Sequence, residues 1–261
     1  MKGWLQMERV IFKKNPLDEV ILQFMFPTIL SINANDPVDF QEAIRQSFPR
    51  YRVMTGNQQE FQIERGISGG RVTPISNKKN KNYEFVSADG RSKLNLTSSF
   101  IAISTLSYTR WEDFWGAFEE PLSKFIEIYK PAFFERIGLR YVDIISRNDL
   151  GLKDKRWDEL IKQDWLGVLA FTDEDKVKLT HNEAEFVLDD GVTRLKIRTG
   201  LGERPETREK VFVADTDYIY VENIKTDQYD DIVSTLHGYS KYFIENIITE
   251  TLIDAMEPEP L

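Results

Sequence analysis

Arg136 and Arg140 stand four residues apart in RIGLRYVDII, residues 136–145, and their spacing is suited to binding an anion. The alternation of this segment predicts a β-strand, in which successive side chains point to opposite faces of a sheet. Both arginines then share one face with Gly138, whose missing side chain leaves room for an approaching group. We take Arg136, Arg140 and Tyr141 as candidates for contact with an anion or an acidic partner.

Asp143 lies on the opposite, apolar face of the same predicted strand, with Ile137, Leu139 and Ile145. An ionised carboxylate in such surroundings costs several kcal/mol unless it is paired. We therefore expect Asp143 to be buried and to form a structural ion pair. Basic residues that could serve as its partner are Lys93, Arg110 and Arg147. The alternative for the whole segment is a half-exposed strand whose charges are all structural.

A second group of acids allows a metal site. Asp215 and Asp217 are two residues apart on another predicted strand and so share a face, and Glu222 follows. Three carboxylates of this kind can bind Mg²⁺ or Mn²⁺, which makes a nuclease or phosphohydrolase the most concrete enzyme hypothesis. A solvated strand end explains the same residues, and we expect no metal and no cofactor.

Other catalytic signatures are missing from the sequence. The chain has no cysteine, which excludes thiolate metal sites and cysteine nucleophiles. Its two histidines, His181 and His237, lack the spacing of a metal-binding motif. The glycine-rich stretches at 66–70 and 200–202 match no phosphate-binding pattern, and no nucleophile elbow occurs. These absences favour a non-catalytic protein.

Composition describes a globular, acidic chain. It has 261 residues, 41% of them hydrophobic, and a formal net charge of −9 at pH 7. Such a charge does not attract a phosphate backbone, so nucleic acid is not favoured as a partner. No apolar run approaches a membrane span, and the first residues do not resemble a signal peptide. We expect a cytoplasmic location.

The elements that must position these residues are strands in hairpins and a few amphipathic helices. Asp89-Gly90 and Asp190-Gly191 each separate two β-type runs, which predicts a hairpin at both places. Apolar residues at helical spacing predict long helices over 110–129 and 227–256, and a short one over 155–163. Further β-type runs cover 166–172, 176–180, 183–188 and 211–224. Hairpins with segregated helices predict an α+β fold with antiparallel sheet.

An internal repeat accompanies this pattern. EFVSADGRSKL at 84–94 and EFVLDDGVTRL at 185–195 agree at six of eleven positions. Each copy continues through β-type sequence into a long helix, so we predict a duplicated hairpin–strand–helix unit. The predicted organisation is a first α+β unit at 1–146, a linker with a short helix at 147–165, and a second unit at 166–261. The two units can share one core.

Three stretches carry a family resemblance: LNLTSSFIAISTLSYTRWEDF, IYKPAFFERIGLRYVDII and LHGYSKYFIENIITETL. They resemble a sporadically distributed family of uncharacterised prokaryotic proteins of about this length, and the match covers nearly the whole chain. The resemblance implies no settled activity, cofactor or catalytic set. It does imply loci that are mobile or linked to antiviral defence. Residues that match the family motifs are Trp111, Glu112, Pro131, Arg136, Gly138, Arg140 and Tyr141.

The leading hypothesis is therefore a non-catalytic interaction protein, a regulatory or accessory subunit of a multi-component bacterial system that contacts another protein subunit. The aromatic residues Trp111, Trp115 and Phe118, or the helix at 227–256, could also support a homo-oligomer. One rival is the metal-dependent nuclease or phosphohydrolase. The other is a small-ligand sensor with a pocket between the two units, lined by Tyr141, Arg140 and aromatic side chains.

Overall fold

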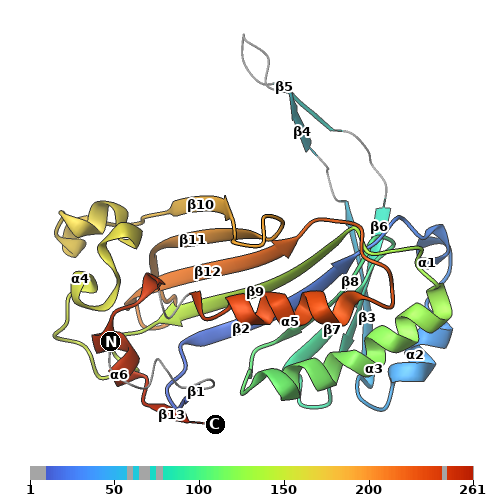
Figure 1. Cartoon of the computed structure of the whole chain (residues 1–261), viewed down its shortest axis with the longest axis horizontal. Coiled ribbons are helices and arrows are strands. Elements are labelled where there is room, and N and C mark those ends of the chain that lie inside the picture. The colour runs from blue at the N-terminus through green and yellow to red at the C-terminus, as the bar shows by residue number, and fades with distance from the viewer. Residues whose placement is uncertain (1–9, 58–60, 65–70, 75–78, 243–245, 261) are drawn as a thin grey trace.

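The main feature of the fold is a single nine-stranded antiparallel sheet with the strand order β10-β11-β12-β9-β2-β8-β7-β6-β3 (Figure 1). The structure is a computed structural model, and it describes residues 10–57, 61–64, 71–74, 79–242 and 246–260. The strands of the sheet are β2 Leu17–Met25, β3 Arg50–Asn57, β6 Lys79–Val86, β7 Ser92–Leu96, β8 Phe100–Thr105, β9 Arg136–Ile145, β10 Asn182–Val187, β11 Arg194–Glu203 and β12 Lys210–Tyr220.

Two helices, α3 and α5, cross the same face of the sheet (Figure 1). The helices are α1 Leu30–Ala34, α2 Val38–Ile44, α3 Trp111–Tyr129, α4 Trp157–Leu160, α5 Tyr229–Tyr239 and α6 Glu250–Ala255. The core lies between sheet and helices, where Phe24 of β2 contacts Phe118 of α3 and Tyr229 of α5 at ring-centroid distances of 5.7 and 5.6 Å. The predicted α+β class with antiparallel sheet is confirmed. We call this helix-covered side the inner face and the opposite side the outer face.

Both predicted hairpin turns form, and local chemistry explains them. Gly90 and Gly191 have φ values of +79° and +74°, which favour glycine because it has no Cβ. Asp89 accepts a hydrogen bond from the backbone N–H of Arg91 at 3.0 Å, and Asp190 accepts one from Val192 at 2.9 Å. The turns join β6 to β7 and β10 to β11.

The order of elements is the same in the two halves of the chain. Strands β6, β7 and β8 form a meander that precedes α3, and β10, β11 and β12 form one that precedes α5. The meanders flank the central antiparallel pair of β2 and β9. Strands of the predicted units 1–146 and 166–261 thus join side by side into one continuous sheet, because β9 of the first unit pairs with both β2 and β12. The duplication itself stays a prediction.

The segment before β10 differs from the expectation. Residues 166–172 and 176–180 are not strands, and the region instead holds 3-10 helices at Gln163–Trp165, Gly167–Ala170 and Glu174–Lys176. Within 166–172 the buried residues are Leu166 and Leu169, and a spacing of three suits a 3-10 turn rather than a pleated strand. Of the three predicted strands only the last exists, as β10.

The predicted helix 227–256 is also wrong as one element. It is divided into α5 and α6 because the chain between them pairs with another segment. Ile248 forms a β-bridge with Ile161, and the N–H of Lys162 donates to the carbonyl of Ile247 at 2.8 Å. Thr249 then caps α6 by accepting from the N–H of Leu252.

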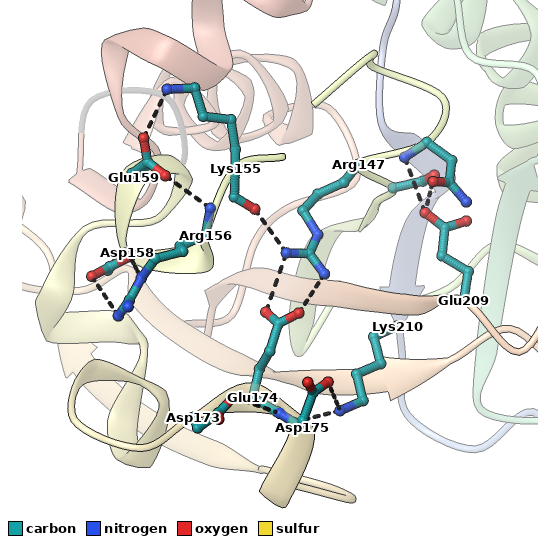
Figure 2. Close-up of polar contacts among 12 residues, drawn as sticks. Arg147, Lys155, Arg156, Asp158, Glu159, Asp173, Glu174, Asp175, Glu209 and Lys210 are labelled. Atoms are coloured by element: carbon teal, nitrogen blue, oxygen red, sulfur yellow. Dashed lines mark hydrogen bonds and ion pairs between the residues drawn. The ribbon is translucent and has the colours of Figure 1, made fainter. Parts of the chain in front are cut away.

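Charged contacts hold residues 147–176 against the end of the sheet (Figure 2). The Arg147 guanidinium donates to both carboxylate oxygens of Glu174, at 2.6 and 3.2 Å, and to the carbonyl of Lys155 at 2.7 Å. It also lies 4.5 Å from the ring centroid of Trp157. Lys210 of β12 donates to the Glu174 carbonyl and lies 3.8 Å from Asp175. The predicted short helix 155–163 is found here as α4.

Two smaller sheets complete the fold. β1, Val10–Phe12, pairs antiparallel with β13, Pro258–Pro260. β4, Phe61–Glu64, pairs with β5, Arg71–Pro74, and this hairpin projects away from the main body (Figure 1). Within the described ranges, no helix is both long and apolar enough to cross a membrane.

Candidate functional site

The two predicted arginines lie on the outer face, where a ladder of ion pairs crosses neighbouring strands. Arg140 of β9 donates to both carboxylate oxygens of Asp215 on β12, at 2.6 and 2.7 Å. Arg198 of β11 donates to the same carboxylate at 2.9 Å. Arg136 donates to Asp217 at 3.1 Å and to Gln23 of β2 at 2.7 Å. The ladder therefore connects β11, β12, β9 and β2.

These contacts favour the structural alternative for Arg136 and Arg140. The hydrogen bond with Asp215 raises the pKa of Arg140. The expected open space at Gly138 is filled by the chain itself, because a Cβ there would lie 2.8 Å from the Arg136 guanidinium. An anion approaching this face would have to compete with carboxylates already in place. Binding of an acidic partner here stays a prediction.

The same pairs weaken the metal hypothesis. Asp215 and Asp217 do share a face, but their carboxylates receive hydrogen bonds from arginines. Glu222 lies beyond the end of β12, is exposed, and accepts from the hydroxyl of Tyr220 at 3.3 Å. Over the part of the chain that the structure describes, no group of three or more His, Cys, Asp or Glu side chains is arranged to hold a metal ion.

Asp143 lies on the inner face and is buried, with 5% of its surface exposed. Its expected ion pair is not found: no hydrogen bond or salt bridge links its side chain to another described residue. Arg110 pairs instead with Asp113 and Arg147 with Glu174, while Lys93 is on the outer face of β7, opposite Ser104. Burial raises the pKa of Asp143 to about 8, so the acid is predominantly protonated at neutral pH.

The neighbours of Asp143 on the helix side are polar and aromatic. The hydroxyl of Tyr141 lies 3.2 Å from Nδ1 of His237 on α5, and the Ser240 hydroxyl donates to the His237 carbonyl at 2.6 Å. The His237 ring is stacked on Trp111, the first residue of α3, with centroids 4.2 Å apart and planes within 7°. The end of α5 and the start of α3 are thereby held together above β9.

Strand β12 contributes two more polar side chains to this place. Thr216 is opposite Tyr141 in the register, is fully buried, and its hydroxyl has no hydrogen-bond partner of acceptable geometry. Burial raises the pKa of the Tyr218 phenol, and the nearby Thr216 hydroxyl opposes that rise. Asp143 is the register partner of Ala214, which is the smallest inner side chain of β12. The rings of Tyr141 and Tyr218 lie beside this pair.

We call this group the inner polar cluster; its members are Tyr141, Asp143, Thr216, Tyr218, His237 and Ser240. The four strand residues form a buried floor, and the two α5 residues are half-buried. Tyr108 and Trp111, also half-buried, border the cluster. It thus reaches from the core to the surface.

The chemistry of the cluster is that of binding rather than of nucleophilic attack. Burial raises the pKa of Tyr141 and of Tyr218, so both phenols stay neutral donors. Asp143 is a buried carboxyl that burial keeps neutral, and its side chain makes no hydrogen bond or ion pair with another described residue. Buried polar groups without partners are rare in folded proteins and are concentrated where a ligand or water completes them.

Sequence reasoning named Tyr141 and Asp143 but missed Thr216, Tyr218, His237 and Ser240 as a group. A weak signal was present, since Tyr141 and Asp143 on one strand and Thr216 and Tyr218 on another are each two residues apart. Both pairs therefore share a face within their strand. Nothing in the sequence shows that the two strands are neighbours.

A cavity of about 280 Å³ lies elsewhere, between the first residues of β2 and the chain that follows β9. Its lining includes Lys14, Leu17, Ile144, Asp149 and Arg204. Lys14 pairs with Glu257 at 2.7 Å and Arg204 with Asp149 at 2.9 Å. The cavity holds no buried, unpaired acid comparable with Asp143, and we assign no site to it.

Comparisons with known proteins find only distant likenesses among solved structures. No protein-family model matches the chain, and no curated protein matches it. Among solved structures, the crystal structure of the di-domain ARO/CYC StfQ from the steffimycin biosynthetic pathway matches with a TM-score of 0.20 and 8% sequence identity. The match covers 92% of this chain and 96% of that one. A likeness at this level does not bear on function.

Proposed function

We propose that the protein binds a small molecule at the inner polar cluster and acts as a sensor or regulatory protein. The observation that supports this function is Asp143, a buried acid without a partner among the described residues, on a face that also carries the Thr216 hydroxyl, for which no partner is found there either. Two such groups on adjacent strands cost free energy in the empty protein. A ligand that satisfies both recovers that cost on binding.

The cluster selects the chemistry of the ligand. Asp143 offers acceptor oxygens, the phenols of Tyr141 and Tyr218 offer hydroxyls, and the half-buried Trp111 offers an aromatic edge. A small primary or secondary amine fits this set best, because its ammonium group supplies the missing counter-charge of an ionised Asp143. We still expect the protein to perform this function as one subunit of a regulatory system that contains other proteins.

Calorimetric titration with a panel of small aliphatic and aromatic amines tests the proposal. At pH values below about 8 Asp143 is protonated, so an ammonium ligand that ionises it releases a proton. The apparent binding enthalpy should then differ between buffers of different ionisation enthalpy, by close to one proton per site. Binding should also raise the melting temperature in a concentration-dependent way.

Asp143→Asn is the decisive variant, since the amide keeps the shape of the side chain but cannot ionise. It should lose amine binding and proton release together. Asp217→Asn is the matched control, because Asp217 is on the outer face of β12. Amine affinity that is equal in the Asp143→Asn variant and the wild type would overturn the proposal, as would the absence of binding by every amine in the panel.

A further inference from the structure

Both edges of the large sheet are open. Strands β10 and β3 are its terminal strands, and neither makes backbone hydrogen bonds beyond those to β11 and β6 within the described ranges. Their side chains are exposed: Val187 of β10 shows 56% of its surface and Met54 of β3 shows 47%. Open strand edges are templates for pairing with another chain, and proteins usually protect them with charge.

The two edges carry opposite charges. The outer face of β10 presents Glu183 and Glu185, and the outer face of β3 presents Arg50 and Arg52. A second copy approaching β10 with its own β10 sets carboxylates near carboxylates, and two β3 edges set arginines near arginines. Like charges opposite one another destabilise a strand pair, whereas opposite charges stabilise it. Each edge therefore disfavours its own copy and suits the other edge.

Eight antiparallel steps separate β10 from β3, so the two edge strands run in the same direction. We propose that β10 of one molecule pairs in parallel with β3 of a second copy of this chain, which extends the sheet from molecule to molecule with the inner faces on the same side. In the register that opposes Glu185 to Arg52, Glu183 falls opposite Arg50. Ala184 then meets Tyr51 on the inner side, so both members of every pair are on the same face. The pairing covers Tyr51 and Val53, which are 41% and 40% exposed.

The existing ion pairs leave this contact available: Arg52 pairs with Glu84 of β6 but keeps 60% of its side chain exposed. Glu183 binds Lys196 and Arg198 of the neighbouring β11, at 3.0 and 2.8 Å, and Glu185 lies 3.7 Å from Arg194. All three basic residues belong to β11, which lies on the side of β10 away from the open edge. The glutamates remain 43% and 45% exposed, so an added strand meets their free side.

The symmetry of this contact decides what it builds. Because the two surfaces differ, each molecule keeps one free β10 and one free β3 after pairing. Head-to-tail contacts of this type close into rings or continue as filaments, and they do not stop at a two-fold dimer. Association should weaken with added salt because the complementary charges are exposed.

Sedimentation velocity over a concentration series tests the proposal with two charge-reversed variants, Glu183→Arg and Arg50→Glu. These residues face each other in the proposed register. Both substitutions are at exposed positions outside the inner polar cluster, so amine binding should stay unchanged and the melting temperature should change little. The wild type should assemble beyond the dimer at low salt, and each variant alone should need at least tenfold higher concentration.

An equimolar mixture of the two variants is the critical sample, because it brings opposite charges together again at both junctions. The mixture should assemble like the wild type, and so should a chain that carries both substitutions. A wild type that stays monomeric at low salt would overturn the proposal. So would a closed dimer indifferent to both substitutions, or a mixture that associates no better than its components.

Discussion

At the scale of single residues, the unusual property of the protein is an acid that the fold keeps neutral. Asp143 was expected to be buried with a cation, and it is buried without one. The fold accommodates it by protonation, which is the ordinary response of a carboxyl in an apolar, unpaired environment. Folding stability must then depend on pH through this one side chain.

The wild type should lose stability relative to Asp143→Asn as the pH rises from about 4 to about 8. The folded pKa is raised to about 8 from the ordinary value of 3.8, so over this range the folded state holds a proton that the unfolded state has released. Stability from this group is full below the lower pKa and falls by roughly 1.4 kcal/mol per pH unit up to the higher one.

Urea unfolding of both proteins across this pH range measures the effect, and the difference between them isolates Asp143 from every other titrating group. The difference should level off above about pH 8. A difference that is constant with pH would show that Asp143 ionises normally in the folded protein.

At the scale of strands and helices, the outer-face ladder ties elements that are far apart in sequence. Arg140 and Asp215 are 75 residues apart, yet their bidentate contact joins β9 to β12. Arg198 extends the contact to β11. The face has no covering helix in Figure 1, and paired charges serve there in place of an apolar layer.

Arg140→Met should destabilise the protein by roughly 1–3 kcal/mol, because it leaves the Asp215 carboxylate with Arg198 alone. The side chain of Asp215 is 9% exposed, whereas that of Arg140 is 39% exposed, so solvent screening holds the loss toward the lower end of this range. Chemical denaturation measures it. Arg156→Met is the control: that arginine is 75% exposed, and its removal should cause no measurable loss of stability. Equal losses in the two variants would contradict a structural role for the ladder.

Sequence patterns predicted elements well where a local rule decides them. The period-two alternation of β9 and the Asp-Gly turns require only near neighbours, and both are found as predicted. The patterns failed where contacts with a distant part of the chain determine the structure. An example is Ile248, whose bridge to Ile161 interrupts the expected long helix. The same distinction applies to the candidate site. Alternation placed Asp143 on the buried face, but its neighbours His237 and Thr216 come from elements that sequence alone does not bring together.

At the scale of the whole molecule, one sheet runs through both predicted halves. β9 belongs to the first unit, 1–146, but it pairs along its length with β12 of the second unit. The helices α3 and α5, one from each unit, contact each other through Trp111 and His237. Neither unit encloses its own core, so the halves should not be independent in stability.

We therefore expect one cooperative unfolding transition for the full chain. Separately expressed fragments 1–146 and 147–261 should each lack a stable fold, because separation exposes the apolar edges of β9 and β12. Circular dichroism and calorimetry of the fragments, alone and after co-refolding, measure this. Recovery of the native transition only on co-refolding is the expected result, and a fragment that melts cooperatively by itself would contradict it.

The pairing of β1 with β13 has a mechanical consequence. Val10 is the register partner of Pro260, so the two strands meet at the ends through which tension would enter the molecule. In an antiparallel pair loaded from that end, force reaches the hydrogen bonds one after another, as in a zipper, instead of stretching all of them at once. The exposed ion pair between Lys13 and Glu259 offers little resistance to that opening. A pull on the two ends should thus peel this clip away at low force, well before the large sheet carries any load.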